Sequence, residues 1–434
     1  MESYWNPYIE TLSRDELTIL QNKRLRSTLD KVYSRVPFYR GKMQEKGLLP
    51  GDVKTVEDLK LLPFITKQDM RDTYPYGLLA EPLETISRIH ASSGTTGKQT
   101  VVGYTKRDLD LWSECMARCL VMAGASKNDI VQVCYGYGLF TGGLGAHGGA
   151  ELLGAAVIPA STGNTRRQIT MMKDFGSTVL CCTPSYALYL GDSLKDFGLT
   201  KDDITLKIGI FGAEPWSRNM RKEIEERLGI EAFDIYGLSE IMGPSVSQDC
   251  KCHQGLHVWE DSFIPEIVDM ETLEPVPDGV AGELVITTID KEGLPLIRFR
   301  TRDIGSITHE KCACGRVHAR MSKLSGRSDD MLIIRGVNVF PSQIESVLLE
   351  SGETSPHYQI IVDRVNNLDT MTVEIEVSES LFSDFVKGLE DLESRLRAQI
   401  ESVLGISCKV RLVEPKSITR SEGKAKRVID KRII

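Results

Sequence analysis

This sequence of 434 residues has little that would direct it to a membrane or to a nucleic acid. No apolar run approaches the roughly 20 consecutive residues that a membrane-spanning helix needs. Basic residues are not in excess, since 53 Lys and Arg stand against 61 Asp and Glu, for a net charge of −8. A chain without a global positive field is not drawn to nucleic acid or to anionic lipid. Anionic ligands must therefore be held by local positive groups.

The beginning of the sequence lacks a basic segment followed by an apolar run, so we expect no signal peptide. Ten cysteines without such a signal indicate a reducing compartment, in which thiols stay free or bind a metal. We therefore expect a cytoplasmic protein. The sequence also has no internal repeat and no low-complexity tract. Its length favours a large domain together with at least one smaller one.

Short apolar runs alternate with segments of helical period through the first half of the chain. We expect strands at 130–133, 156–158, 178–181, 208–211 and 232–236, and helices at 8–47, 66–74, 106–124 and 218–228. Buried strands that alternate with helices indicate parallel β-α units. From about residue 255 the pattern changes to hairpin-like strands, at 257–259, 266–268, 282–288 and 303–308.

A third pattern begins near residue 330. It predicts strands at 331–334, 358–362, 372–377 and 409–413, a helix at 341–351 and a charged helix over 380–403. The Gly/Arg/Ser/Asp segment at 326–330 is typical of a hinge between domains. The sequence thus predicts an α/β fold. A large N-terminal domain (1–328) would have mixed or parallel sheets flanked by helices and a β-rich part at about 245–325. A small, mobile α+β domain (329–434) would follow.

The most informative motif is a loop rich in glycine and hydroxyl groups. It consists of Ser92, Ser93, Gly94, Thr95, Thr96, Gly97 and Lys98. Its glycines let the backbone turn so that successive N–H groups converge on one point, which the hydroxyls and the lysine surround. The loop therefore suits a polyphosphate, with a flexible surface turn as the alternative. It is no Walker A loop, because two residues separate its glycines where that motif has four.

Further stretches carry groups that a nucleotide needs. They contain Ala213, Glu214 and Pro215; Tyr236, Gly237, Ser239 and Glu240; Asp303; and Arg327 with Asp329. Small residues at the carboxyl end of a buried strand allow a flat base to stack against the backbone. The carboxylate of Glu240 suits a divalent cation, and that of Asp303 suits two ribose hydroxyls. Taken singly, Tyr236 also fits an ordinary core residue and Asp303 a turn residue, so the order and spacing of the set carry the argument.

These motifs together resemble the acyl-adenylate-forming superfamily and, within it, the phenylacetate–coenzyme A ligases. The similarity covers nearly the whole chain and is closest in SSGTTGK, YGLSE, LPLIRFRTRD and GRSDDMLIIRGVNVFPSQIE. It implies that an aryl acid is activated with ATP, that pyrophosphate is released, and that the acyl group then passes to coenzyme A. It also implies that the small C-terminal domain rotates between the two half-reactions, and that the protein forms homodimers.

The resemblance also implies residue roles. The loop from Ser92 to Lys98 would bind phosphates; Ala213, Glu214, Pro215, Tyr236 and Gly237 would line an adenine slot; Glu240 would hold Mg²⁺; Asp303 would bind the ribose; Arg327 would contact ribose or phosphate; Asp329 would be the hinge; and Gly336 would border the pantetheine tunnel. Lys424 matches the lysine that reaches the carboxylate and the α-phosphate, with Lys426 as the alternative. A cation between these two anions lowers the barrier to their reaction. Without the resemblance, this basic tail would be interpreted as a solvated end.

The acid pocket is expected in the stretch from residue 135 to residue 143. Tyr135, Tyr137 and Phe140 would supply apolar walls, and Gly142 would let a planar substrate approach the backbone. The alternative is that one or two of these rings are ordinary core residues. The run contains no positive side chain, which favours a neutral aryl tail over a diacid.

Cysteines and histidines form two groups in the β-rich part of the sequence. Cys312 and Cys314 lie on one turn, and the segment from Cys250 to His257 lies upstream. Four thiolate or imidazole ligands complete a structural zinc site. The resemblance implies a site of Cys250, His257, Cys312 and Cys314. Cys252 or His253 could replace one of the first two, and free thiols are the alternative to a metal.

The expected function is therefore an aryl-acid–coenzyme A ligase that uses ATP, Mg²⁺ and coenzyme A and carries a structural Zn²⁺. One alternative is an adenylate-forming enzyme that delivers the aryl group to an amine or to a carrier-protein thiol. A second alternative, from another class, is a catalytically silent zinc-containing protein that senses nucleotide or acyl-CoA. The joint presence of Glu240, Asp303, Arg327 and Lys424 argues against a sensor.

Overall fold

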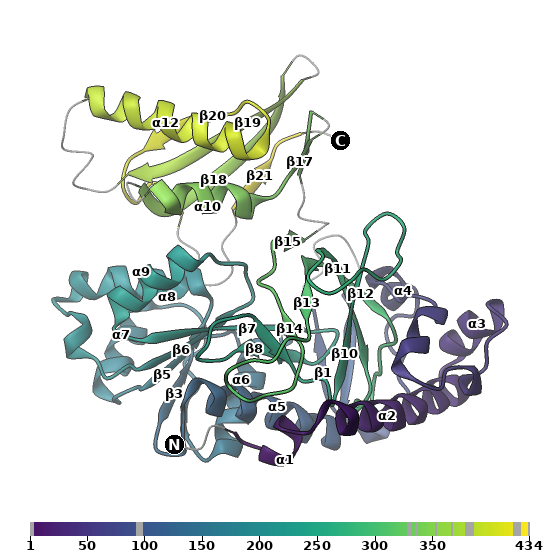
Figure 1. Cartoon of the computed structure of the whole chain (residues 1–434). Coiled ribbons are helices and arrows are strands. Elements are labelled where there is room, and N and C mark those ends of the chain that lie inside the picture. The colour runs from purple at the N-terminus through teal and green to yellow at the C-terminus, as the bar shows by residue number, and fades with distance from the viewer. Residues whose placement is uncertain are drawn as a thin grey trace.

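A computed structural model of the chain describes residues 4–92, 99–327, 332–335, 337–351, 354–365, 368–377, 386–419 and 427–432. The expected α/β architecture is confirmed, with a large N-terminal part and a small C-terminal part (Figure 1). None of the helices in these ranges is long and apolar enough to cross a membrane.

The chain begins with helices along one side of the large part. They are α1 (Pro7–Glu10), α2 (Arg14–Arg35), α3 (Pro37–Glu45) and α4 (Lys67–Asp72). The helical character expected over 8–47 is confirmed, as three helices, with a break at Val36, which has extended backbone angles before Pro37. Proline disfavours helical geometry in the residue before it, and it has no N–H to continue the helix. The helix expected over 66–74 is confirmed as α4, which Thr66 caps.

A nine-stranded sheet forms the centre of the large part. Its strands are β3 (Ile130–Val133), β4 (Ala156–Ile158), β5 (Val179–Cys182), β6 (Ile208–Gly212), β7 (Glu231–Leu238), β8 (Gly243–Asp249), β9 (Leu256–Val258), β13 (Ile307–Thr308) and β14 (Arg320–Met321). Their order is β13-β14-β9-β8-β7-β6-β5-β3-β4. The neighbouring strands β4, β3, β5, β6 and β7 pair in parallel. The remaining pairs of the sheet are antiparallel. The expected parallel β-α units are thus confirmed.

Helices cover both faces of this sheet. They are α5 (Lys106–Ala123), α6 (Gly142–Leu153), α7 (Thr165–Asp174), α8 (Pro184–Ser193) and α9 (Arg218–Leu228). Alternate residues of the strands face opposite sides. Cys181 and Ile210 pack in the cluster with α5 and α6, whereas Cys182 and Phe211 pack in the cluster with α7, α8 and α9.

Smaller sheets complete the large part. A four-stranded sheet has the order β10-β11-β12-β15, and a hairpin pairs β1 with β2. These strands are β1 (Ile86–Ala91), β2 (Val101–Thr105), β10 (Phe263–Val268), β11 (Gly282–Thr288), β12 (Phe299–Gly305) and β15 (Gly326–Arg327). The single strand expected over 303–308 is wrong, because the chain leaves one sheet after Gly305 and enters the other at Ile307.

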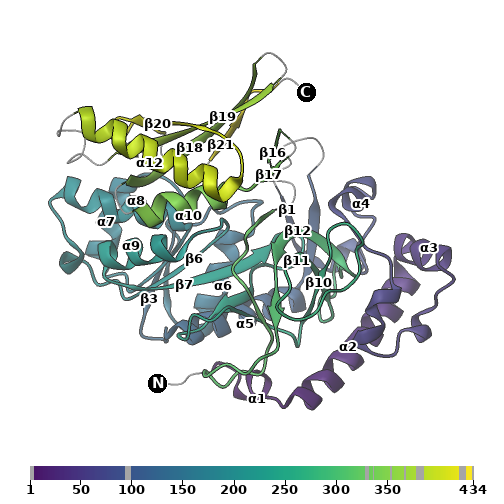
Figure 2. The same cartoon turned by 45° about the horizontal axis from the view of Figure 1, so that its top comes forward.

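The C-terminal part has a core of its own. Its elements are β16 (Leu332–Ile334), β17 (Val337–Val339), α10 (Pro341–Ser351), β18 (Thr354–Val365), β19 (Leu368–Val377), α12 (Val386–Leu404), β20 (Lys409–Val413) and β21 (Val428–Asp430). Four of the strands form a sheet in the order β20-β19-β18-β21. Ile344 of α10, Ile360 of β18 and Leu396 of α12 are fully buried in one cluster. Figures 1 and 2 both show α10 lying beside α9 of the large part.

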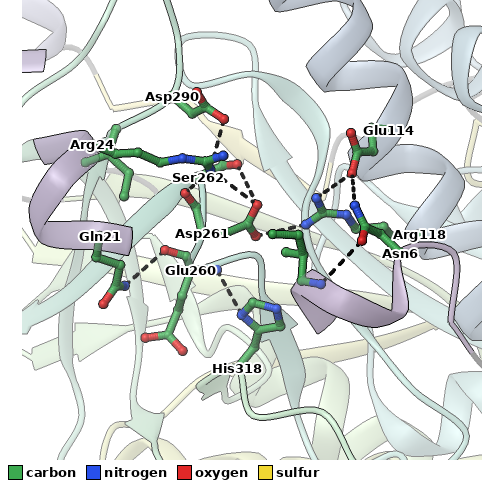
Figure 3. Close-up of polar contacts among 12 residues, drawn as sticks. Asn6, Gln21, Arg24, Glu114, Arg118, Glu260, Asp261, Ser262, Asp290 and His318 are labelled. Carbon is green, nitrogen blue, oxygen red and sulfur yellow. Dashed lines mark hydrogen bonds and ion pairs between the residues drawn. The ribbon is translucent and has the colours of Figure 1, made fainter. Parts of the chain in front are cut away.

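A buried ion network ties the N-terminal helices to the large part (Figure 3). Arg118 of α5 donates to Asp261 at 2.8 Å and to Glu114 at 2.7 Å. Arg24 of α2 donates to the carbonyl oxygen of Asp261 and pairs with Asp290 at 2.9 Å. Burial by itself would raise the pKa of Asp261, but Arg118 and its other cationic neighbours hold it below its ordinary value. The network holds α2 against the body that carries the candidate site.

Candidate active site

Two neighbouring parallel strands end at the same edge of the large sheet. Gly212 at the end of β6 pairs with Ile235 of β7. Ala213 then adopts a left-handed backbone with φ of 71°, and the sequence continues to Glu214, which accepts a hydrogen bond from the Ser185 backbone at 2.7 Å. The predicted base-binding stretches are therefore adjacent at carboxyl ends of strands, where open α/β sheets hold ligands.

Gly237 is required by close packing at this edge. A Cβ atom at residue 237 would lie 1.7 Å from the carbonyl oxygen of Gly243. Any side chain would therefore force β7 and β8 apart. A glycine here keeps the backbone beside Tyr236 close to the neighbouring strand.

Tyr236 and Asp303 meet although they come from different sheets. The Tyr236 hydroxyl donates to Oδ2 of Asp303 at 2.6 Å, and both residues are buried. Asp303 in β12 also pairs in register with Arg327 of β15. The structure thus brings together three positions that the sequence placed at a nucleotide. The side chain of Arg327 lies outside what the structure describes.

Glu240 lies at the base of the glycine-hydroxyl loop. Its Oε1 accepts a hydrogen bond from Thr100 at 3.0 Å and pairs with Nζ of Lys67 at 3.2 Å. Thr100 in turn contacts Ser92 through their hydroxyls, and the Ser92 backbone donates to the Thr100 carbonyl at 3.0 Å. Ser92 begins the loop and Thr100 follows it in sequence, so Ser92 lies beside a residue that contacts a buried carboxylate.

Lys291 supports the backbone that carries Glu240. Its Nζ donates to the carbonyl oxygens of Glu240 at 3.3 Å and Ile241 at 2.7 Å. It also lies 4.5 Å from the ring centre of Tyr104, whose hydroxyl donates to the Ser239 carbonyl at 3.2 Å. Burial lowers the pKa of Lys291 to about 8. The Ser239 side chain contacts Thr141 at 3.0 Å.

The proposed acid-pocket residues occupy different environments. Tyr135 is buried, whereas Tyr137 contacts Nδ1 of His147 through its hydroxyl at 3.2 Å and Phe140 is 45 % exposed. Gly142 begins α6, and a Cβ there would lie 2.7 Å from the Phe140 ring. The Leu139 carbonyl accepts a hydrogen bond from Ala91 at 3.0 Å. The end of this segment therefore lies beside the strand that leads into the loop, and its role as an acid pocket stays a prediction.

A second site is formed by three cysteines and a histidine. The ligand atoms of Cys250, His257, Cys312 and Cys314 all lie within 4.8 Å of one another. The Cys250 and Cys312 sulfurs are 3.7 Å apart, and the Cys314 sulfur is 3.3 Å from Nε2 of His257. Zinc–sulfur bonds of about 2.3 Å in a tetrahedron place sulfurs about 3.8 Å apart, so this spacing fits a zinc site.

The surroundings of this cluster favour the same four ligands. Nδ1 of His257 lies 3.3 Å from the His318 carbonyl, which leaves Nε2 directed at the sulfurs. Such a second contact commonly fixes the ring of a metal-binding histidine. His253 instead contacts Asp249 at 2.9 Å. Among the described residues, neither His253 nor Cys252 belongs to the cluster.

Several predicted site residues lie outside the described residues. They are Ser93, Gly94, Thr95, Thr96, Gly97, Lys98, Asp329, Gly336 and Lys424, together with the alternative Lys426. Sequence reasoning missed Lys67, Thr100 and Lys291. Thr100 is two positions beyond the loop and could have been included with it. Lys67 and Lys291 reach Glu240 from distant parts of the chain, and no local motif marks them.

Comparison with models of protein families identifies the class of enzyme to which the chain belongs. Residues 19–289 match the model of the AMP-binding enzyme family, and residues 336–432 match the AMP-binding enzyme C-terminal domain. The chain therefore belongs to the AMP-binding enzymes. Within them it groups with the phenylacetate–coenzyme A ligases. It is 51% identical to that of Escherichia coli over 98% of this chain and 97% of the relative. It is 48% identical to that of Thermus thermophilus over 99% of each.

Solved structures of 2-hydroxyisobutyryl-CoA ligase also resemble this chain. The structure in the postadenylation state, in complex with 2-HIB-AMP, has a TM-score of 0.93 at 29% identity and covers 99% of this chain and 92% of that one. The structure in the thioesterification state, with 2-HIB-AMP and CoA, has a TM-score of 0.74 at 30% identity and covers 99% of this chain and 93% of that one. Because the two structures are of one protein, the difference in score reflects how its parts are arranged. The present chain has the postadenylation arrangement.

Proposed function

We propose that this protein activates phenylacetate, or a closely related aryl acid, with ATP and transfers the acyl group to coenzyme A. The products would be the aryl-acetyl-CoA thioester, AMP and pyrophosphate. The observation that carries the proposal is the hydrogen bond between Tyr236 and Asp303 beside the carboxyl ends of β6 and β7. The full-length similarity to phenylacetate–coenzyme A ligases supports the choice of acid.

The first half-reaction requires that two anions meet, the carboxylate of the acid and the α-phosphate of ATP. The carboxylate of Asp303, oriented by Tyr236, would accept hydrogen bonds from the ribose hydroxyls. Lys67 would offset negative charge beside the loop that begins at Ser92, since electrostatic stabilisation is the main means of such catalysis. Lys424 would bring a further cation to the reacting groups, and Arg327 would contact the ribose or phosphate.

Glu240 is the residue that would hold Mg²⁺. The ion would offset phosphate charge when bound. Glu240 is buried, and its carboxylate lies between Thr100 and Lys67, so an oxygen ligand is present beside Thr100, which contacts Ser92 at the beginning of the loop. The backbone around it is held by Lys291, which fixes the position of this carboxylate relative to Ser92.

The cluster of Cys250, His257, Cys312 and Cys314 would hold a structural zinc ion. Four protein ligands leave no open position for a reacting group. Tyr4 donates to the Cys314 carbonyl at 2.8 Å, so the turn that carries two of the ligands also contacts the N-terminal segment. The ion would stabilise this junction.

The domain boundary is proposed between residues 328 and 329. β15 ends at Arg327 within a sheet of the large part, and the elements from β16 onward include those of the separate C-terminal core. We also propose that the protein acts in the cytoplasm, where ATP and coenzyme A are available, and that it forms homodimers, which light scattering would test.

Product formation with a panel of acids tests the proposed function. Purified protein with ATP, Mg²⁺ and coenzyme A should form a thioester from phenylacetate, and kcat/KM across ring-substituted phenylacetates, indoleacetate and benzoate should rank the substrates. The Lys424→Ala variant should lose adenylation by orders of magnitude and still form thioester from supplied acyl-AMP. Failure to form any thioester, with acyl transfer to an amine or a carrier protein instead, would favour the alternative acceptor.

A further inference from the structure

The boundary between the two parts of the chain has its own set of contacts. α10 lies beside α9 in both views (Figures 1 and 2). Leu349 of α10 packs against the apolar cluster that α7, α8 and α9 form with the large sheet. A leucine from the C-terminal part therefore contributes to a core of the N-terminal part. If the two parts separated, the apolar surface of this leucine would be returned to water.

A contact between a histidine and a carboxylate crosses the same boundary. Nε2 of His357, in β18, lies 3.8 Å from Oδ2 of Asp192, in α8. Asp192 is also paired with Arg227 of α9. Burial alone would raise the pKa of Asp192, but His357 and Arg227 lower it below its ordinary value. Asp192 thus lies between a cation of its own domain and a histidine of the other.

Charged residues of both parts of the chain also interact at this boundary, beside the candidate active site. Tyr358, next to His357, donates to Glu345 of α10 at 3.2 Å, and the Arg427 guanidinium lies 4.5 Å from the Tyr358 ring centre. Burial alone would lower the pKa of Arg427, but Tyr358, Glu345 and Glu214 raise it. Glu214 belongs to the large part and follows β6. Its negative charge therefore acts on the residue that begins the last described segment.

We propose that Asp192, His357 and Leu349 form a latch that holds the C-terminal domain in the postadenylation arrangement and that opens before the thioester is formed. The proposal rests on the proposed function. These three are positioning residues, because none of them contacts the predicted nucleotide site. The latch joins α10 and β18 of the C-terminal part to α8 and α9 of the large part. It consists of one ion-pair contact and one packed leucine, and neither of these is strong by itself. A partly exposed ion pair contributes little to stability because water screens it, so the latch can open during turnover.

The test separates the two half-reactions in the double variant Asp192→Asn/Leu349→Gln. Phenylacetate-dependent pyrophosphate exchange should fall roughly three- to tenfold, because loss of the contact between Asp192 and His357 across the boundary, together with one packed leucine, shifts the equilibrium away from this arrangement. Thioester formation from supplied phenylacetyl-AMP and coenzyme A should be unchanged or faster. Amide hydrogen exchange in 341–351 should increase while the melting temperature stays within a few degrees of the wild type.

Glu223→Gln is the matched control. Glu223 is a partly exposed carboxylate on α9 that pairs with Arg227 within the large part. This variant should leave both half-reactions and the exchange of 341–351 unchanged. The latch is contradicted if the double variant loses both half-reactions to the same extent, or if neither changes. If the wild type forms neither product, the proposed function fails, and unchanged exchange in 341–351 of the double variant would still overturn the latch independently.

Discussion

Tyr236 and Asp303 join the large sheet to the four-stranded sheet by a buried hydrogen bond of 2.6 Å. Tyr236 lies at the end of β7, and Asp303 lies opposite Arg327 near the proposed hinge. The contact fixes a carboxylate at the place where the two sheets meet, beside β15, which ends at Arg327. A ligand that binds this carboxylate would therefore lie where the two sheets meet.

Removing the Tyr236 hydroxyl should weaken nucleotide binding. In Tyr236→Phe the Asp303 carboxylate loses the donor that orients it, and a hydrogen bond to a charged group contributes about 1.5–3 kcal/mol. We expect the KM for ATP in pyrophosphate exchange to rise roughly tenfold or more. Tyr39→Phe is the control, because Tyr39 is also buried and donates to the Pro295 carbonyl at 2.9 Å. It should leave this KM unaltered, and an equal effect of both variants would refute the assignment.

Lys67 should contribute to the adenylation rate. Lys67→Gln removes a cation 3.2 Å from Glu240, where phosphate charge is expected, so kcat for pyrophosphate exchange should fall about tenfold or more. Lys42→Gln is a matched control, since Lys42 has a similar exposure and pairs with Asp69 at 3.3 Å. A Lys67 variant as active as the Lys42 variant would show that Lys67 is only a surface ion-pair residue.

The metal content should depend on the four clustered ligands. Elemental analysis of the purified protein should give about one zinc per chain, because the four ligands make one tetrahedral site. Cys312→Ser should lower the zinc content and the melting temperature. Cys252→Ser should alter neither, since Cys252 lies outside the cluster. Full zinc content in Cys312→Ser, or its loss in Cys252→Ser, would contradict the ligand set.

Lys291 should make stability depend on pH in the alkaline range. Burial lowers its pKa from 10.5 to about 8, so between these values the unfolded chain binds more protons than the native one. Below pH 8 the folded protein bears the full free-energy cost of burying a charged lysine. This cost is relieved as the pH rises from 8 to 10.5, because the folded protein then releases the proton before the unfolded chain does. Relative to Lys291→Met, the wild type should gain up to about 3 kcal/mol over this range. The measurement compares thermal melts of both proteins, and a constant difference would disprove the lowered pKa.

Local patterns predicted much of the fold. The strand at 130–133 and the helix at 341–351 were predicted with the bounds that the structure has, because an apolar run marks the strand and a proline at the first helical position marks the helix. The sequence did not indicate that the chain switches sheets between Gly305 and Ile307, since that depends on the partners of each strand. The hairpin of β1 and β2 was also missed, although it flanks the predicted loop.

The candidate site was predictable to the extent that its residues lie in short motifs. Glu240 follows β7 and Asp303 lies within β12, and their positions could be inferred from the sequence order. Lys291 could not, because it contributes through contacts with backbone carbonyls 50 and 51 positions away along the chain. For the zinc cluster, the sequence left Cys252 and His253 as alternatives to Cys250 or His257. In the folded chain neither belongs to the cluster, and His253 contacts Asp249 instead.

The most direct test of the account is phenylacetate-dependent exchange of labelled pyrophosphate into ATP, measured first without coenzyme A and then with it. The account predicts exchange that requires the acid, is weakened by Asp303→Asn, and gives way to stoichiometric AMP and phenylacetyl-CoA when coenzyme A is added. Exchange that is absent with every arylacetic and benzoic acid, or that is equally fast in Asp303→Asn, would contradict it.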